Sequence, residues 1–193
     1  MRQSSAGSAL ESTPELLVGP RSATNAGAGV VLPGSALHLA RGKIQQSAAV
    51  WRSERLNGGW ARVDLPDSGA KGEAVSAQCA GHNCVVAGYV DNAVALWRLS
   101  PSTVSRLPDV PQVASSPRSP IPAPLVSGAG IIEVVSAGLN VVVLTGGGQH
   151  WALSRGPVGR AASSALAGGW LNVIAEPAVG PAVLWRCPVK DLG

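Results

Sequence analysis

The residue pair with the clearest chemistry is Cys79 and Cys84, which flank the short interval 80–83. This interval contains Gly, His and Asn, which favour a tight turn, and apolar runs on either side predict two strands. A hairpin with this turn would bring the two Cβ atoms to the ~3.8 Å that a disulfide needs. We therefore predict a Cys79–Cys84 disulfide, the alternative being two reduced, partly buried thiols. Cys187 has no local partner and is predicted to be a core thiol, the alternative being a pairing outside the chain.

The spacing of the candidate residues does not favour a metal site or a cofactor site. Cys79, His82 and Cys84 make a poor zinc site, because a structural site needs four ligands and no second cluster lies nearby. The other two histidines, His38 and His150, fall in distant parts of the chain. The sequence contains no HExxH, GxSxG or Walker pattern. These observations predict that the protein binds no metal and no cofactor.

The alternative function is that of an enzyme, a hydrolase or lyase with its active site at the axis of a ring of repeats. Four carboxylates are the candidate catalytic residues for it. Such a site needs two acids in one pocket, about 5–9.5 Å apart in glycoside hydrolases. The candidates are Glu73, Asp91, Glu133 and Glu176. Their sequence positions alone do not bring any two together, so we consider an enzyme less well supported than a binding protein.

The elements that position these residues recur along the chain. Residues Glu73–Arg98 hold three apolar runs separated by turn-forming residues, which predicts a meander of three antiparallel strands. Related patterns cover 29–52, 130–153 and 160–186, and in each the last predicted strand carries a tryptophan. These tryptophans are Trp51, Trp97, Trp151 and Trp185. In the first copy we expect strands at 30–32, 36–40 and 48–52. Short fourth strands are expected at 60–65 and 104–107.

Composition supports an all-β fold. Apolar residues make up 46% of the 193 residues and charged residues 13%, while 24 Gly and 15 Pro punctuate the chain. We predict one repeat domain over 14–193 and a disordered N-terminus over 1–13. The net charge of +4 is scattered, which argues against nucleic-acid binding. No apolar run reaches the ~20 residues of a membrane helix, and Met1–Thr13 lacks the apolar stretch of an export signal.

The face pattern of the strands favours a small β-propeller or propeller fragment of about four blade-like meanders. Residues 93–97 and 141–144 are apolar on both faces, so both faces must be covered. Neighbouring blades cover both faces, whereas a two-layer β-sandwich covers one and is the alternative. Recurring tryptophans are expected in the core. Trp60 and Trp170 fall outside the recurring position and are predicted as surface contacts.

One repeat resembles a known group of proteins. Cys79 and Cys84 with the following Val-Val-Ala-Gly-Tyr, and Ala-Leu-Trp-Arg at 95–98, resemble the cysteine-hairpin repeats of exported actinobacterial β-propeller proteins. This resemblance implies an extracytoplasmic or cell-envelope location and a binding or scaffolding role, with no particular ligand.

The expected function is a non-enzymatic module that presents loops, including Pro108–Pro124, to a protein or glycan at the cell envelope. A structural subunit of a larger assembly is a further alternative, which a large exposed apolar patch would favour. We also expect the strand at 15–18 to complete the last meander as its outer strand and so to close a ring. If the ring does not close, free strand edges would favour a homo-oligomer or a larger complex.

Overall fold

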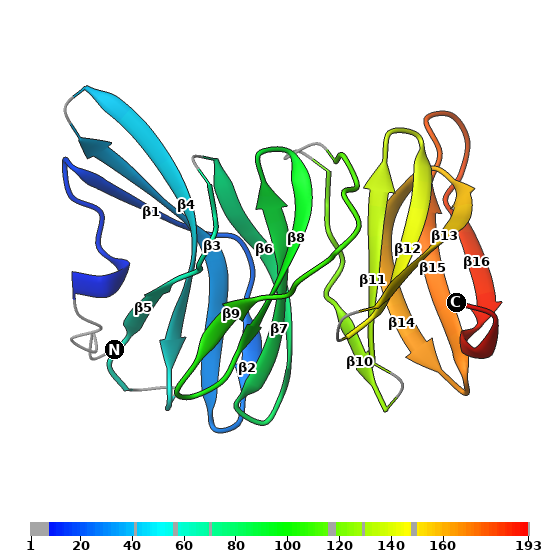
Figure 1. Ribbon diagram of the computed structural model, residues 1–193, viewed down its shortest axis with the longest axis horizontal. Coiled ribbons are helices and arrows are strands. Elements are labelled where there is room, and N and C mark those ends of the chain that lie inside the picture. The colour runs from blue at the N-terminus through cyan, green and yellow to red at the C-terminus, as the bar shows by residue number, and fades with distance from the viewer. Residues whose placement is uncertain are drawn as a thin grey trace. The chain divides into compact units, whose positions relative to one another are not determined.

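The computed structural model describes residues 8–40, 42–55, 58–69, 71–115, 119–128, 130–147 and 150–192. Within them the chain forms sixteen β-strands in four antiparallel sheets and two 3-10 turns, which confirms the predicted all-β fold of four successive meanders (Figure 1). The chain divides into two compact units, the first comprising Met1–Asp91 and Leu96–Arg106, the second Asn92–Ala95 and Leu107–Gly193. No helix in this part of the chain has the length and apolarity to cross a membrane.

The first sheet has the order β1-β3-β4-β5, and β2 also pairs with β3. Its strands are β1 (Leu16–Pro20), β2 (Thr24–Ala26), β3 (Gly29–Ala40), β4 (Lys43–Ser53) and β5 (Ala61–Asp64). The break expected after residue 32 is wrong, because β3 continues through Pro33-Gly34. A Cβ on Gly34 would lie 2.3 Å from the Gly19 carbonyl oxygen, so glycine lets β1 approach β3 at this point.

The N-terminal strand does not complete the last sheet, so the expected ring closure is wrong. β1 pairs with β3 instead, from Leu16 opposite His38 to Pro20 opposite Gly34. β3 offers a long edge only a few residues further along the chain, and closing that short loop costs less entropy than pairing with the distant C-terminal part. Within the stretch expected to be disordered, Ser8–Leu10 forms the 3-10 turn η1, and residues 1–7 lie outside the described residues.

The second sheet reproduces the predicted three-strand meander and adds the short fourth strand. Its order is β6-β7-β8-β9. The strands are β6 (Gly72–Ala80), β7 (Asn83–Val90), β8 (Ala93–Leu99) and β9 (Val104–Arg106). The turn Asp91-Asn92 has φ of 49° and 67°, the left-handed backbone that a two-residue hairpin requires. Both faces of β7 and β8 are largely buried, as their apolar sequences require.

The first two sheets pack through β6, which lies against β3 and β4. Gly72 makes the close approach possible, since a Cβ there would lie 2.9 Å from the Ala48 backbone nitrogen. The guanidinium of Arg21 forms an ion pair with Glu73, and the Ser22 hydroxyl donates to the Val75 carbonyl at 2.8 Å. The link between β1 and β2 is thus fastened to the second sheet.

The second unit contains the other two sheets, with the orders β10-β11-β12-β13 and β14-β15-β16. The strands are β10 (Leu125–Ser127), β11 (Gly130–Ala137), β12 (Asn140–Gly146), β13 (Trp151–Val158), β14 (Arg160–Ala167), β15 (Trp170–Glu176) and β16 (Val183–Pro188). A strand at β10 was not expected. Because β10 precedes the third copy, Trp151 begins the fourth strand of its sheet, rather than lying on the third.

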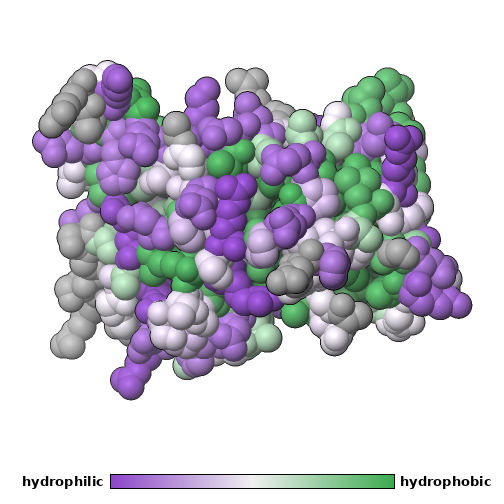
Figure 2. Space-filling model, viewed as in Figure 1, coloured by the Kyte–Doolittle hydropathy of each residue, from purple (hydrophilic) through white to green (hydrophobic). Residues whose placement is uncertain are grey.

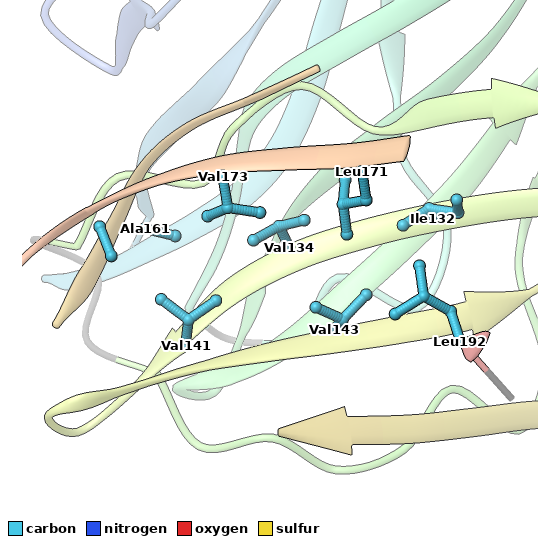
Figure 3. Packing of buried hydrophobic residues seen from close by; sticks show 9 residues of the cluster. Ile132, Val134, Val141, Val143, Ala161, Leu171, Val173 and Leu192 are labelled. Atoms are coloured by element: carbon cyan, nitrogen blue, oxygen red, sulfur yellow. The ribbon is translucent and has the colours of Figure 1, made fainter. Parts of the chain in front are cut away.

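The core of the second unit lies between these two sheets. Figure 3 shows aliphatic side chains of β11 and β12 pointing toward those of β14 and β15, with Leu192 closing the cluster. Leu192 follows the 3-10 turn η2 (Val189–Asp191), and its carbonyl accepts the Thr145 hydroxyl at 3.2 Å. The Ser136 hydroxyl accepts the Ala161 N–H at 2.9 Å and so satisfies a polar group inside this apolar core.

Two tryptophans bond to the linkers that precede their sheets. Trp97 Nε1 donates to the Pro66 carbonyl at 2.8 Å, and Trp151 Nε1 donates to the Pro108 carbonyl at 3.0 Å. Both prolines follow a leucine just after a fourth strand. Trp51 is fully buried, yet its Nε1 has no hydrogen-bond partner in the described part of the chain.

Candidate interaction surface

The outer face of the fourth sheet carries several exposed apolar side chains. Along β15 the side chains alternate, so Leu171 and Val173 enter the core while Trp170, Asn172 and Ile174 face outward. Trp170 is 39% exposed and Ile174 41% exposed. An outward position on a strand usually carries a polar residue, so apolar side chains of this size on the outer face indicate a contact surface.

The neighbouring strand β16 extends this face. Ile174 stands opposite Leu184, which is 62% exposed, and Asn172 stands opposite Arg186. Directly opposed side chains on one face of an antiparallel pair lie within contact distance. The face therefore places an apolar pair, Ile174 and Leu184, next to a polar pair.

A cation–π contact orders the polar part of the face. The guanidinium carbon of Arg186 lies 5.0 Å from the centroid of the Trp170 ring, within the range of such contacts. Arg186 makes no ion pair within the described residues, so its charge remains available to a partner. Asn172 donates to the carbonyls of Ala165 and Trp170, which holds its amide flat on the sheet.

Small side chains and one ion pair complete the surface. On β14 the outward residues opposite β15 include Ala165 and Ala167, which leave the face flat. At its edge Arg160 and Glu176 lie 3.7 Å apart, an exposed pair that contributes little stability. In Figure 2, apolar side chains of the second unit gather at the end that carries β13 and β16. The turn between β15 and β16 adds Val179, which is 90% exposed.

The predicted surface tryptophans have different surroundings. Trp170 lies on the face just described. Trp60 is half-buried and packs against the cluster of Ala36, Ala49 and Trp51 in the first sheet, beside η1.

The segment 108–124, expected to be presented as a loop, is anchored over its described length. Val113, Ser115 and Ile121 are buried, and the Ser115 hydroxyl donates to the Ser136 carbonyl at 2.7 Å.

The predicted disulfide is confirmed. Cys79 and Cys84 are bonded, with their Cα atoms 4.0 Å apart, and they face each other across the β6–β7 hairpin. The Gly81-His82 turn fixes this register, and a pair one step from such a turn has its side chains close together. Cys187 is a free, partly buried thiol that packs against the core of the second unit, and burial raises its pKa.

The four candidate carboxylates have separate environments. Glu73 pairs with Arg21, Glu176 pairs with Arg160, and Asp91 lies in the β7–β8 turn. None of them lines the hollows of about 40, 310 and 530 Å³ that the described residues form. The largest of these hollows lies in the second unit between residues 112–114 and β13. Its lining contains neither an acid nor a histidine.

Glu133 is the most unusual of these acids. It is fully buried in the middle of β11, on the face opposite Ile132 and Val134, and neither carboxyl oxygen has a hydrogen-bond partner. Burial raises its pKa well above the usual range, because an ionised carboxylate loses its hydration there, and the Val134 amide offsets only part of this rise. Burial therefore favours the neutral form of this carboxyl group.

Among the described residues, no three His, Cys, Asp or Glu side chains are grouped so that they could hold a metal ion. No protein-family model matches the chain, and no curated protein matches it. The exposed face of the fourth sheet is therefore the feature of this chain that bears on function.

Sequence reasoning missed three residues of that face: Ile174, Leu184 and Arg186. Val50 and Leu96, which precede a Trp-Arg pair as Leu184 does, are buried, so this shared pattern does not distinguish Leu184 from them. The alternation in residues 170–176 was the available signal, because it places Ile174 on the side opposite the core.

Proposed function

We propose that this chain is a non-enzymatic binding and scaffolding module that holds a partner protein on the outer face of its fourth sheet. The observation that carries this proposal is the Trp170–Arg186 contact flanked by exposed Ile174 and Leu184. Tryptophan and arginine dominate the binding energy of protein interfaces, and large aliphatic groups around them exclude water.

The chemistry of the face favours a protein over a glycan. A sugar stacks on an open aromatic ring, but the Arg186 guanidinium already occupies one side of Trp170. Sugar hydroxyls also need polar partners, which Ile174 and Leu184 lack. Ile174 and Leu184 favour a partner with an apolar patch. The unpaired charge of Arg186 favours an acidic side chain beside that patch.

Two observations support a location outside the cytoplasm, at the cell envelope. The Cys79–Cys84 disulfide persists in oxidising compartments. The likeness to exported β-propeller repeats, together with four successive meanders, supports a propeller-type scaffold in the same setting. The same exposed face also fits a structural subunit of a larger assembly, in which the contact would be permanent.

The experiment compares capture by three forms of the full chain, each first checked for an unchanged melting temperature. Trp170→Ala and Arg186→Glu alter the face, and Ile44→Ser alters an exposed apolar residue of the first sheet as a matched control. Proteins captured from an envelope fraction are purified, and their affinities are measured by calorimetry. We expect both face variants to weaken binding at least tenfold and the control to leave it unchanged. Equal binding by all three forms would contradict the proposal.

A further inference from the structure

The first and second sheets share a register between their third and fourth strands. In the first, Trp51 on β4 stands opposite Arg62 on β5. In the second, Trp97 on β8 stands opposite Arg106 on β9. Side chains that stand directly opposite one another in an antiparallel pair lie within contact distance. Both tryptophans are fully buried.

The residues beside these pairs also correspond. Arg52, which follows Trp51, stands opposite the small residue Ala61, and Arg98 stands opposite Ser105. In both sheets the sequence reads small residue, arginine and then an apolar residue, which is Val63 within β5 and Leu107 directly after β9. Its arginine is fixed in each case, by the Asp64 carboxylate at 3.1 Å in β5 and by the Asp67 carbonyl, which accepts from Arg106 at 2.9 Å.

Within the described residues the fourth sheet has the third strand and no fourth strand. β16 carries the same Trp-Arg pair, Trp185 and Arg186, and is the last strand in the order β14-β15-β16. On the side of β16 away from β15, no strand of the described residues pairs with it at Trp185, whose side chain is partly exposed. β16 pairs with β15 along its whole length on one side, so its other side presents N–H and C=O groups without a strand partner.

We propose that β16 binds an extended segment of another polypeptide as an added antiparallel fourth strand. The segment carries a small residue opposite Arg186, an arginine opposite Trp185 and then an apolar residue. Backbone hydrogen bonds hold the strand, and its arginine takes the position opposite Trp185 that Arg62 and Arg106 take opposite Trp51 and Trp97. This inference goes beyond the proposed function, since it uses the edge of the sheet and not its face.

The probe for this edge is a capped, fluorescently labelled peptide with the sequence of residues 61–66, ARVDLP. We expect saturable binding to the full chain by fluorescence anisotropy. The same peptide with Arg62→Glu should bind at least tenfold more weakly. Two peptides N-methylated at alternate residues test the geometry, because only alternate N–H groups of an antiparallel strand face its partner. One should lose binding at least tenfold, and the other should stay within about threefold.

Hydrogen exchange locates the bound peptide and separates this proposal from the previous one. Added protection should fall on residues 183–188, and Trp170→Ala in the full chain should leave peptide binding unchanged. Equal loss with both N-methylated peptides would overturn the proposal. So would changed exchange at β5 or β9, which would show that the peptide exchanges with the chain's own strands. A dimer in sedimentation with β16 protected before peptide is added would also overturn it, because a second copy would then fill the edge.

Discussion

At the scale of single residues, the indole N–H groups of Trp51 and Trp97 differ in a way that packing alone does not explain. Both rings are fully buried in the third strand of their sheets. Only Trp97 has an acceptor, the Pro66 carbonyl. An unpaired buried N–H costs about 1–3 kcal/mol. The Nε1–H of Trp51 therefore offsets part of the stability that burial of its large apolar ring provides.

This difference predicts unequal costs for the same substitution. Trp97→Phe should lower the free energy of unfolding by about 1–2 kcal/mol more than Trp51→Phe, because only the first abandons a hydrogen bond. Both changes remove similar volume from a buried site, so each is the control for the other. Urea unfolding of the two variants provides the comparison. Equal costs would show that the Pro66 bond contributes nothing.

Glu133 predicts a decline of stability with rising pH. Its folded-state pKa is raised above the unfolded value of about 4.3. Between these two values the folded chain binds more protons than the unfolded chain, so stability falls as pH increases, by up to about 1.4 kcal/mol per pH unit. Glu133→Gln stays neutral and should remove this contribution.

The measurement for Glu133 is urea unfolding of wild type and Glu133→Gln at several values between pH 4 and 8. The variant should gain stability relative to the wild type as the pH rises. Other titrating groups are common to both proteins and cancel in the difference. A difference that stays constant over this range would show that Glu133 is not held neutral in the folded chain.

At the scale of the element, β1 is an integral strand of the first sheet. Leu16 and Val18 face the buried cluster around Trp51, together with Leu10 of η1, whereas Leu17 faces solvent. One strand therefore supplies both an edge for β3 and part of a core.

Deleting residues 1–20 should lower the free energy of unfolding by roughly 3 kcal/mol, the value of two to three partly buried aliphatic side chains. Amides of β3 between Gly34 and His38 should then lose their hydrogen-exchange protection, because their strand partner is gone. Leu17→Ser is the control and should change stability by less than about 0.5 kcal/mol. Retained protection at Gly34–His38 in the deletion would contradict the pairing of β1 with β3.

Local patterns predicted the second sheet well and the first and third less well. The β6–β7–β8 meander has turns of two residues and strands with clear apolar runs, so its boundaries could be read directly. Pro33-Gly34 resembles a turn, but it lies inside β3 because β1 packs against Gly34, a contact between segments that local sequence does not show. β10 has only three residues and no distinguishing pattern.

At the scale of the whole molecule, what the sequence could not predict is which faces are left uncovered. The Trp-ended strand looks alike in three repeats, yet Leu96 is buried and Leu184 exposed. The side chains are of one kind, and only the presence of a neighbouring sheet decides their exposure. The disulfide could be predicted because a single turn sets its geometry, whereas the candidate face depends on the packing of separate sheets.

In both indole–carbonyl hydrogen bonds, the acceptor residue precedes the donor tryptophan in the sequence. Pro66 precedes Trp97 by 31 residues, and Pro108 precedes Trp151 by 43. A ribosome has therefore already made each acceptor when the matching donor is added. Neither bond uses a residue that lies beyond its tryptophan in the chain. These linkers suit assembly in the order of synthesis, one repeat after another.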